Sequence, residues 1–76
     1  MPINVLAFAQ AVDALGFRER EIEGAATETP REILRRLAPD LETKNLRVAL
    51  DQEYADWDQP IGNAREMAVI PPVSGG

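Results

Sequence analysis

The group in this chain best suited to chemistry is the carboxylate of its last residue, not a side chain. The 76 residues contain no histidine and no cysteine, which argues against a catalytic triad or a zinc centre. The chain ends in two glycines, Gly75 and Gly76, which leave the last carbonyl sterically open. ATP can convert such a carboxylate to an acyl-adenylate, from which a nucleophile displaces AMP. We therefore expect the reacting group to be the carboxylate of Gly76.

The segment before this carboxylate has the composition of a thin, extended tail. It consists of Pro71, Pro72, Val73, Ser74, Gly75 and Gly76. The two prolines favour a stiff extended backbone and cannot donate to a β ladder, while the two glycines carry no side chains. We expect residues 1–70 to form a domain and residues 71–76 to form a tail that enters a narrow channel in another protein. A frayed end without a role is the alternative.

The other chemistry-bearing residues have simpler interpretations. Asp56 and Asp58 flank Trp57, but no further ligand lies nearby, so we expect a solvated loop and no metal site. Trp57 and Phe8 are expected to pack in the small core, with contact to a partner protein as the alternative for each. Lys44 is the only lysine, and so the only side-chain acceptor if the chain were conjugated to itself.

Composition and charge limit the classes of protein to which this chain can belong. Seventy-six residues correspond to one small domain, which cannot also enclose a deep catalytic pocket of its own. Thirteen acidic against eight basic residues give a net charge of −5, which argues against nucleic acid and suits a basic protein partner. Without cysteines, a signal peptide or an apolar run of about 18–20 residues, the chain is expected to be cytoplasmic and not membrane-bound.

The clearest local signal for an element that supports the tail is a helix start at Thr29. The Thr29 hydroxyl and the Glu32 carboxylate are spaced to form a capping box, and Pro30 suits the first helical position. Pro39 ends the helix by forcing Ala38 out of helical geometry. The main helix is therefore expected at about residues 30–38.

The remaining pattern predicts strands on either side of this helix. Apolar runs or alternating patterns predict strands over 3–9, 18–23, 46–50, 53–55 and 67–70, a helical turn over 10–16 and a loop over 56–63. The first strand is expected to be central and buried on both faces, and the charged second strand to lie at an edge. This order predicts an α+β fold of the ubiquitin-like β-grasp type, a mixed sheet covered by one main helix.

Two stretches carry a specific resemblance. Residues 48–57, Val-Ala-Leu-Asp-Gln-Glu-Tyr-Ala-Asp-Trp, and residues 68–76, Ala-Val-Ile-Pro-Pro-Val-Ser-Gly-Gly, resemble the MoaD/ThiS sulfur-carrier family. The Pro-Pro-Val-Ser sequence before the glycines is most similar to the molybdopterin synthase small-subunit branch. In the turn before the last strand, where the family usually has glycine, this chain has residues 63–66, and Asn63 is expected to accept the positive φ.

The resemblance implies a function in molybdenum cofactor biosynthesis. An E1-like adenylating enzyme using ATP and Mg²⁺ would activate the carboxylate of Gly76, and a persulfide donor would convert it to a thiocarboxylate. The tail would then enter the large subunit of molybdopterin synthase, within a heterotetramer, and donate sulfur to a pterin precursor. The chain would bind no cofactor and act as a non-catalytic subunit and co-substrate. Three alternatives stay open: a carrier for another pathway such as thiamine thiazole, a ubiquitin-like protein modifier, or an interaction module with an inert tail.

Overall fold

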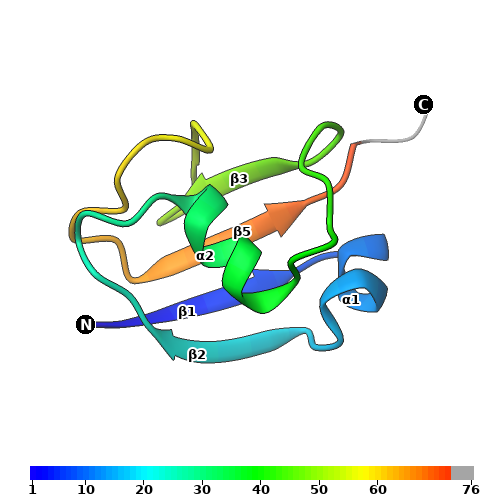
Figure 1. Ribbon diagram of the computed structural model, residues 1–76, viewed down its shortest axis with the longest axis horizontal. Helices are drawn as coiled ribbons and strands as arrows, with labels where there is room; N and C mark the ends of the chain where they lie inside the picture. Colours follow the sequence, from blue (N-terminus) through cyan, green and yellow to red (C-terminus); the bar gives the residue numbers. More distant parts are fainter. Residues whose placement is uncertain (73–76) are drawn as a thin grey trace.

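In the computed structural model, which describes residues 1–72, the chain begins with two antiparallel strands joined through a short helix (Figure 1). β1 (Pro2–Ala7) pairs with β2 (Glu19–Glu23), and α1 (Gln10–Leu15) lies between them in the sequence. Gly16 ends α1 with φ of 82°, a left-handed conformation that favours glycine. The predicted helical turn and the predicted charged edge strand are both confirmed.

The main helix, α2 (Pro30–Leu37), begins as its capping box predicts. The Glu32 backbone N–H donates to Thr29 Oγ1 at 3.2 Å, and the Thr29 backbone N–H donates to Glu32 Oε1 at 2.9 Å. Two of its residues, Ile33 and Leu34, are almost completely buried against the sheet. Local capping chemistry therefore starts the helix, and apolar burial holds it in place.

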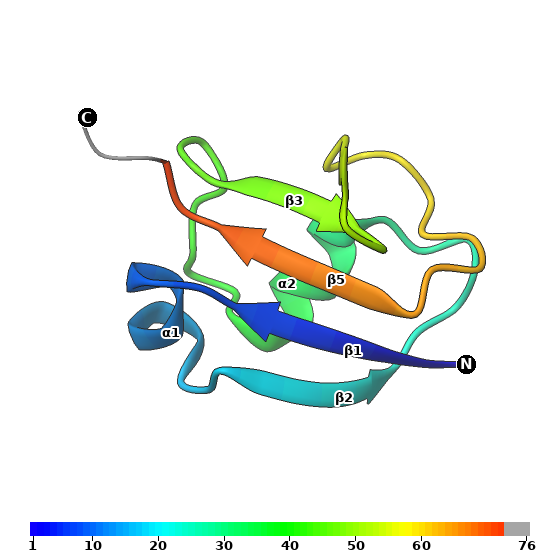
Figure 2. The ribbon, with the colours of Figure 1, turned by 180° about the vertical axis from the view of Figure 1, so that it is seen from behind.

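The C-terminal half supplies the rest of a five-stranded mixed sheet. β3 (Arg47–Leu50) and β4 (Glu53–Ala55) form a hairpin, and β5 (Glu66–Ile70) runs between β1 and β3. The strand order is β2-β1-β5-β3-β4, with β1 and β5 parallel and all other neighbours antiparallel. This is the predicted α+β arrangement, and it places β5, the strand that leads to the tail, in the middle of the sheet (Figure 2).

The β3–β4 hairpin is closed by the predicted tight turn at Asp51 and Gln52. Both residues have positive φ, 50° and 71°, as the favoured two-residue hairpin turn requires. Asp51 Oδ1 accepts hydrogen bonds from the backbone N–H groups of Arg65 and Glu66, at 2.9 and 3.1 Å. The turn therefore also fixes the start of β5.

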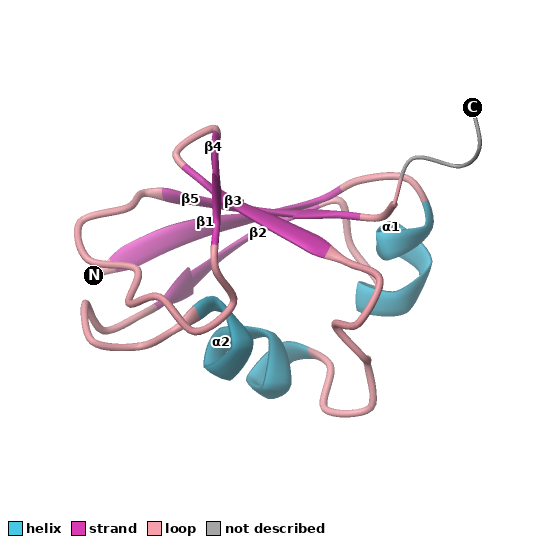
Figure 3. Cartoon of the chain, turned by 90° about the horizontal axis from the view of Figure 1, so that it is seen from above, coloured by secondary structure: helices cyan, strands magenta, loops and turns pink. Residues whose placement is uncertain are grey.

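Two expectations about this part of the fold are wrong. Asn63 does not supply the positive φ before β5, because the adjacent Gly62 does so with φ of 59°. β1 is not buried on both faces either, since only its alternate residues Ile3, Val5 and Ala7 are buried. Within the described residues both helices lie on one side of the sheet, so the opposite side of β1 has no covering layer (Figure 3).

Candidate functional site

The tail leaves the body at the end of β5, beside the start of α1 (Figure 1). The Phe8 backbone N–H donates to the carbonyl of Val69 at 3.2 Å, which holds the segment after β1 against the C-terminal end of β5. A shallow hollow here is lined by Phe8, Ala9, Gln10, Asp13, Ile70, Pro71 and Pro72. The predicted reacting residue Gly76 and the predicted tail residues Val73, Ser74 and Gly75 lie outside the described part of the chain.

Phe8 is exposed beside this exit point, so its expected place in the core is wrong. Its side chain is 48% accessible to solvent, because β1 ends at Ala7 and the chain turns sharply at Ala9. Ala9 has φ of 49° and ψ of −126°, a conformation that is strained for a residue with a Cβ atom. Strained backbone persists where the surroundings over-determine it, and functional sites are enriched in it.

An apolar patch covers the helix-free face of the sheet next to Phe8. The register places Leu6 beside Ala68, Ala68 beside Ala49, and Ala49 beside Tyr54, in one row across four strands. Because paired residues share a face, these side chains point to the same side of the sheet. We call the following residues the open-face patch: Leu6, Phe8, Ala49, Tyr54, Ala68 and Ile70.

The shape of the open-face patch follows from its residue types. The two central alanines leave a hollow between larger neighbours, and Tyr54 stands at one side, 72% exposed. The guanidinium of Arg47 lies 5.8 Å from the centre of the Tyr54 ring, a cation–π distance. Exposed aromatic side chains around an apolar hollow are typical of a protein-binding surface.

One edge of the open-face patch is acidic. In the antiparallel register, Glu19 lies opposite Leu6, Glu21 opposite Asn4, and Glu23 opposite the first residue of β1. These three glutamates therefore line the helix-free side of the edge strand. They discourage edge-to-edge pairing with another sheet and favour a partner with basic residues at the corresponding rim.

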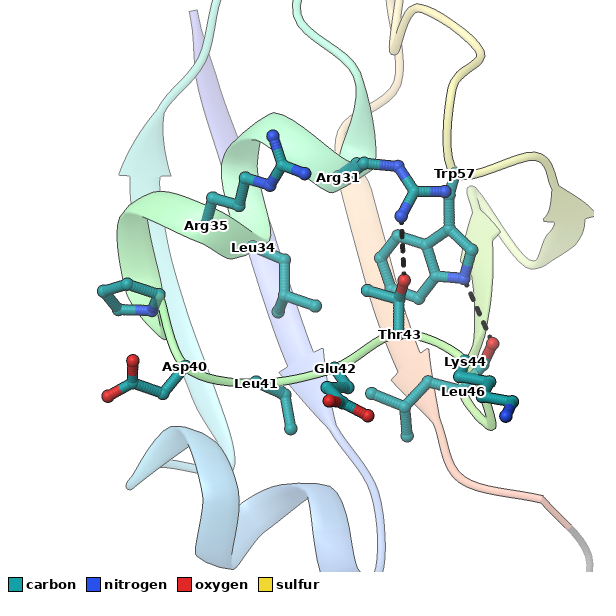
Figure 4. Close-up of a pocket in the computed structure, with 11 residues that line it drawn as sticks. Arg31, Leu34, Arg35, Asp40, Leu41, Glu42, Thr43, Lys44, Leu46 and Trp57 are labelled. Carbon is teal, nitrogen blue, oxygen red and sulfur yellow. Dashed lines mark hydrogen bonds between the residues drawn. The ribbon is translucent and has the colours of Figure 1, made fainter.

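Trp57 occupies a different place, on the helix side of the sheet (Figure 4). It is half-buried against the core, and its Nε1–H donates to the carbonyl of Leu46 at 3.1 Å, which confirms the expected packing role. It lines a surface hollow of about 650 Å³ together with Leu34 and Leu41 of the adjoining segments. The helix side of the sheet, on which Trp57 lies, is opposite to the side that carries the open-face patch.

Asp58, one of the two carboxylates beside Trp57, is held by an arginine. Arg31 Nε donates to Asp58 Oδ1 at 2.8 Å, and Arg31 Nη2 lies 3.3 Å from Asp58 Oδ2. The hydrogen bond and the positive charge of Arg31 lower the pKa of the Asp58 carboxyl below its usual range. Arg31 Nη1 also donates to Thr43 Oγ1 at 2.9 Å. Arg31 therefore links α2 to the loop that contains Asp58 and to the loop that contains Thr43.

Residues 1–72 form neither a cluster of metal ligands nor a long apolar helix. No group of three or more acidic side chains in that range converges on a point where a metal ion could sit. No helix there has the length and apolar character needed to cross a membrane.

The sequence pattern indicated Phe8 only as an alternative partner contact and did not indicate the rest of the open-face patch. The signal for this patch was the alternation of Asn4, Leu6 and Phe8 with buried residues, in β1 and directly after it. The apolar run from Ile3 to Ala9 hid that alternation, because it is also typical of a strand buried on both faces. The contributions of β3, β4 and β5 depend on register, which the local pattern did not specify.

Comparisons with known proteins agree over nearly the whole chain. The ThiS family model matches residues 5–76. A protein named molybdopterin synthase sulfur carrier subunit, from Caenorhabditis briggsae, is 42% identical over 82 aligned residues, covering 97% of this chain and 96% of that protein.

Two solved structures have the same fold as this chain. SAMP1 from Haloferax volcanii superposes with a TM-score of 0.77 at 22% identity and full coverage of both chains. A putative molybdopterin converting factor, subunit 1, from Pyrococcus furiosus gives a TM-score of 0.74 at 21% identity, covering 96% of this chain and 99% of that one. These likenesses confirm the predicted ubiquitin-like β-grasp fold.

Proposed function

The chain belongs to the ThiS family, and from this membership we propose that it is the sulfur-carrier subunit of a molybdopterin synthase. The observation that carries the proposal is the 42% identity to a molybdopterin synthase sulfur carrier subunit over 97% of the chain. The residues Pro71-Pro72-Val73-Ser74 before the terminal glycines give it further support, since they resemble the molybdopterin synthase small-subunit branch more than thiazole-type carriers.

The proposed chemistry takes place at the carboxylate of Gly76. An E1-like partner transfers AMP from ATP, with Mg²⁺, to this carboxylate and releases pyrophosphate. The terminal sulfur of a persulfide donor then attacks the acyl-adenylate and displaces AMP, which gives an acyl disulfide between Gly76 and the donor. A thiol reduces this disulfide, which releases the C-terminal thiocarboxylate and leaves the donor sulfur and the thiol joined in a new disulfide. The large synthase subunit accepts that sulfur onto a pterin precursor, and two such transfers complete a dithiolene. The chain contributes no catalytic side chain to these steps and binds no cofactor of its own.

The arrangement of the exit point supports a docking role for the open-face patch. A partner that takes in the tail must approach the end of β5, and there it meets Phe8, Ile70 and the rest of the patch. The large subunit and the E1-like enzyme both need the tail. We therefore propose that both bind this surface and that their binding is mutually exclusive. Burial of an exposed aromatic side chain then supplies much of the binding energy.

Intact mass spectrometry tests the proposed chemistry directly. The chain is incubated with an E1-like partner, ATP, Mg²⁺ and a sulfide source. We expect a mass gain that corresponds to replacement of one carboxylate oxygen by sulfur, mapped to Gly76. An unchanged mass beside a partner that visibly consumes ATP would contradict the proposal, and adducts on lysines of other proteins would instead favour a ubiquitin-like modifier.

Replacing Phe8 by aspartate is expected to weaken binding of the large subunit by about 10–100-fold, because a charge would enter the apolar docking contact. Isothermal titration calorimetry measures the affinity, and circular dichroism checks that the variant is folded.

The matched control is Thr27→Asp, which adds the same charge at an exposed position in the loop at the opposite end of the sheet. This control should bind like the original chain. Equal affinity of the Phe8 variant and the control would show that the open-face patch is not the docking surface.

A further inference from the structure

The sheet carries opposite charges on the two sides of its open-face patch. On one side is the acidic edge, which consists of Glu19, Glu21 and Glu23 of β2. On the other side, where β3 begins, Lys44 and Arg47 border one surface hollow of about 400 Å³. We call Lys44 and Arg47 the basic corner.

The basic corner adjoins both the open-face patch and the point where the tail leaves. Arg47 lies opposite Ile70 in the register, and its guanidinium lies 5.8 Å from the centre of the Tyr54 ring. Ile70 and Tyr54 both belong to the patch, so Arg47 is on the same side of the sheet. Pro72 borders the same hollow as the two cations. A partner that covers the patch and takes in the tail therefore meets the basic corner.

Both cations of the basic corner are available to such a partner. Their side chains are exposed, and within residues 1–72 neither forms an ion pair within 4.0 Å. Asp56 lines the same hollow but pairs with neither of them. By contrast, Arg31 and Arg36 each pair with a carboxylate of this chain. Unpaired cations at the surface of an acidic chain favour an acidic group of another molecule.

The apolar contact alone does not decide which way round a partner sits. Burial of apolar surface is non-directional, so the hollow at Ala49 and Ala68 does not distinguish a partner from the same partner after a half-turn. The charges do distinguish them. β2 and β3 are three strand spacings apart, about 14–15 Å, which exceeds the Debye length of about 10 Å at 0.1 M salt. The acidic edge and the basic corner therefore act on separate parts of the partner.

We propose that the acidic edge and the basic corner together fix the orientation of the tail-accepting partner on the open-face patch. The partner is a protein whose contact surface carries basic residues over β2 and carboxylates over Lys44 and Arg47. This orientation brings unlike charges together on both sides, whereas a half-turn brings like charges together. The inference rests on the proposed function, which supplies the partner, and adds which way round that partner binds.

Charge reversal at the basic corner tests the inference. The double variant Lys44→Glu, Arg47→Glu changes the net charge of the chain from −5 to −9. We expect its association rate constant with the large subunit of molybdopterin synthase to fall at least about tenfold at low salt. Surface plasmon resonance measures this rate constant. The difference should disappear at about 1 M salt, where the Debye length is about 3 Å.

The salt dependence separates charge from packing. Arg47→Glu also removes the contact with the Tyr54 ring, and the loss of that contact would slow binding at every salt concentration. A decrease that persists unchanged at high salt would therefore overturn the inference.

The matched control makes the same change in net charge away from the basic corner. It is the double variant Arg35→Glu, Arg65→Glu. Arg35 is on the exposed side of α2, and Arg65 directly precedes β5 at the end where that strand begins. The control should associate at about the rate of the original chain, and thermal unfolding checks that both double variants are folded. Equal rate constants for the control and the basic-corner variant would overturn the inference.

Glu21→Lys tests the acidic edge. This change makes the chain less acidic, but it places a cation opposite the partner's basic residues. We expect the association rate constant to fall about threefold or more at low salt. An unchanged rate constant would show that β2 makes no charge contact, which would overturn the proposed pair of contacts.

These measurements separate the inference from the proposed function. If the original chain does not bind the large subunit at all, the proposed function and the orientation inference are both contradicted. If every variant binds like the original chain and accepts sulfur normally, the carrier function stands and the orientation inference alone is overturned.

Discussion

Removal of Gly75 and Gly76 is expected to abolish sulfur loading and sulfur transfer while leaving the fold intact. In the proposed function, the chain would then end on Ser74, with its carboxylate two residues short of the reacting position and with a side chain beside it. A misplacement of even about 1 Å can cost about 100-fold in rate, so a displacement of two residues should leave no measurable activity. Intact mass after loading and the rate of pterin sulfuration by the reconstituted synthase measure the effect.

Two controls separate chemistry from folding in this experiment. The thermal midpoint of the truncated chain should match that of the full chain, because the described core is complete without these residues. Gly76→Ala keeps the tail length and adds one methyl group beside the carboxylate, and we expect a partial loss of transfer. Normal pterin sulfuration by the truncated chain would contradict the assignment of the reacting carboxylate to Gly76.

Replacement of Ile33 by alanine is expected to lower the free energy of unfolding by about 2–5 kcal/mol, the largest effect on stability that we predict. Ile33 is 0% exposed and lies at the contact between α2 and the sheet, where the loss of three carbons leaves a cavity. A small domain has a free energy of unfolding of about 5–15 kcal/mol, so this change removes a large part of it. Urea denaturation followed by circular dichroism measures the difference.

Arg35→Ala on the exposed side of the same helix is the matched control. Both substitutions end in alanine, the best helix former, so helix propensity does not account for a difference between them. The control should change the free energy of unfolding by no more than about 0.5 kcal/mol. A loss below about 1 kcal/mol for Ile33→Ala would show that the helix-to-sheet contact is less important than its burial indicates.

The two predictions concern different parts of the molecule. The folded domain sets the point at which the tail begins. β5 lies between two strands of the sheet, so the chain leaves the sheet at a fixed point beside Phe8. In the proposed function, the terminal glycine contributes the reacting group. Loss of the glycines should therefore remove activity without unfolding, whereas loss of Ile33 should remove stability without touching the chemistry.

The local features of this protein could be predicted from short stretches of its sequence. The capping box at Thr29 and Glu32 depends on residues three apart, and the turn at Asp51 and Gln52 depends on two neighbours, so both are readable from adjacent residues. The prediction that Gly76 carries the reacting group uses the same kind of local signal, because the prolines and glycines on which it rests are close together in the sequence.

The surface that lies beside the end of β5 could be found only from the tertiary structure. The open-face patch combines residues of four strands, and only the register brings Leu6, Ala68 and Ala49 into one row. The exposure of Phe8 also depended on the tertiary structure, because a short apolar run is compatible with burial on one face or on both. Pairing between distant strands and the side taken by the helices are properties of the whole chain, and no local pattern specifies them.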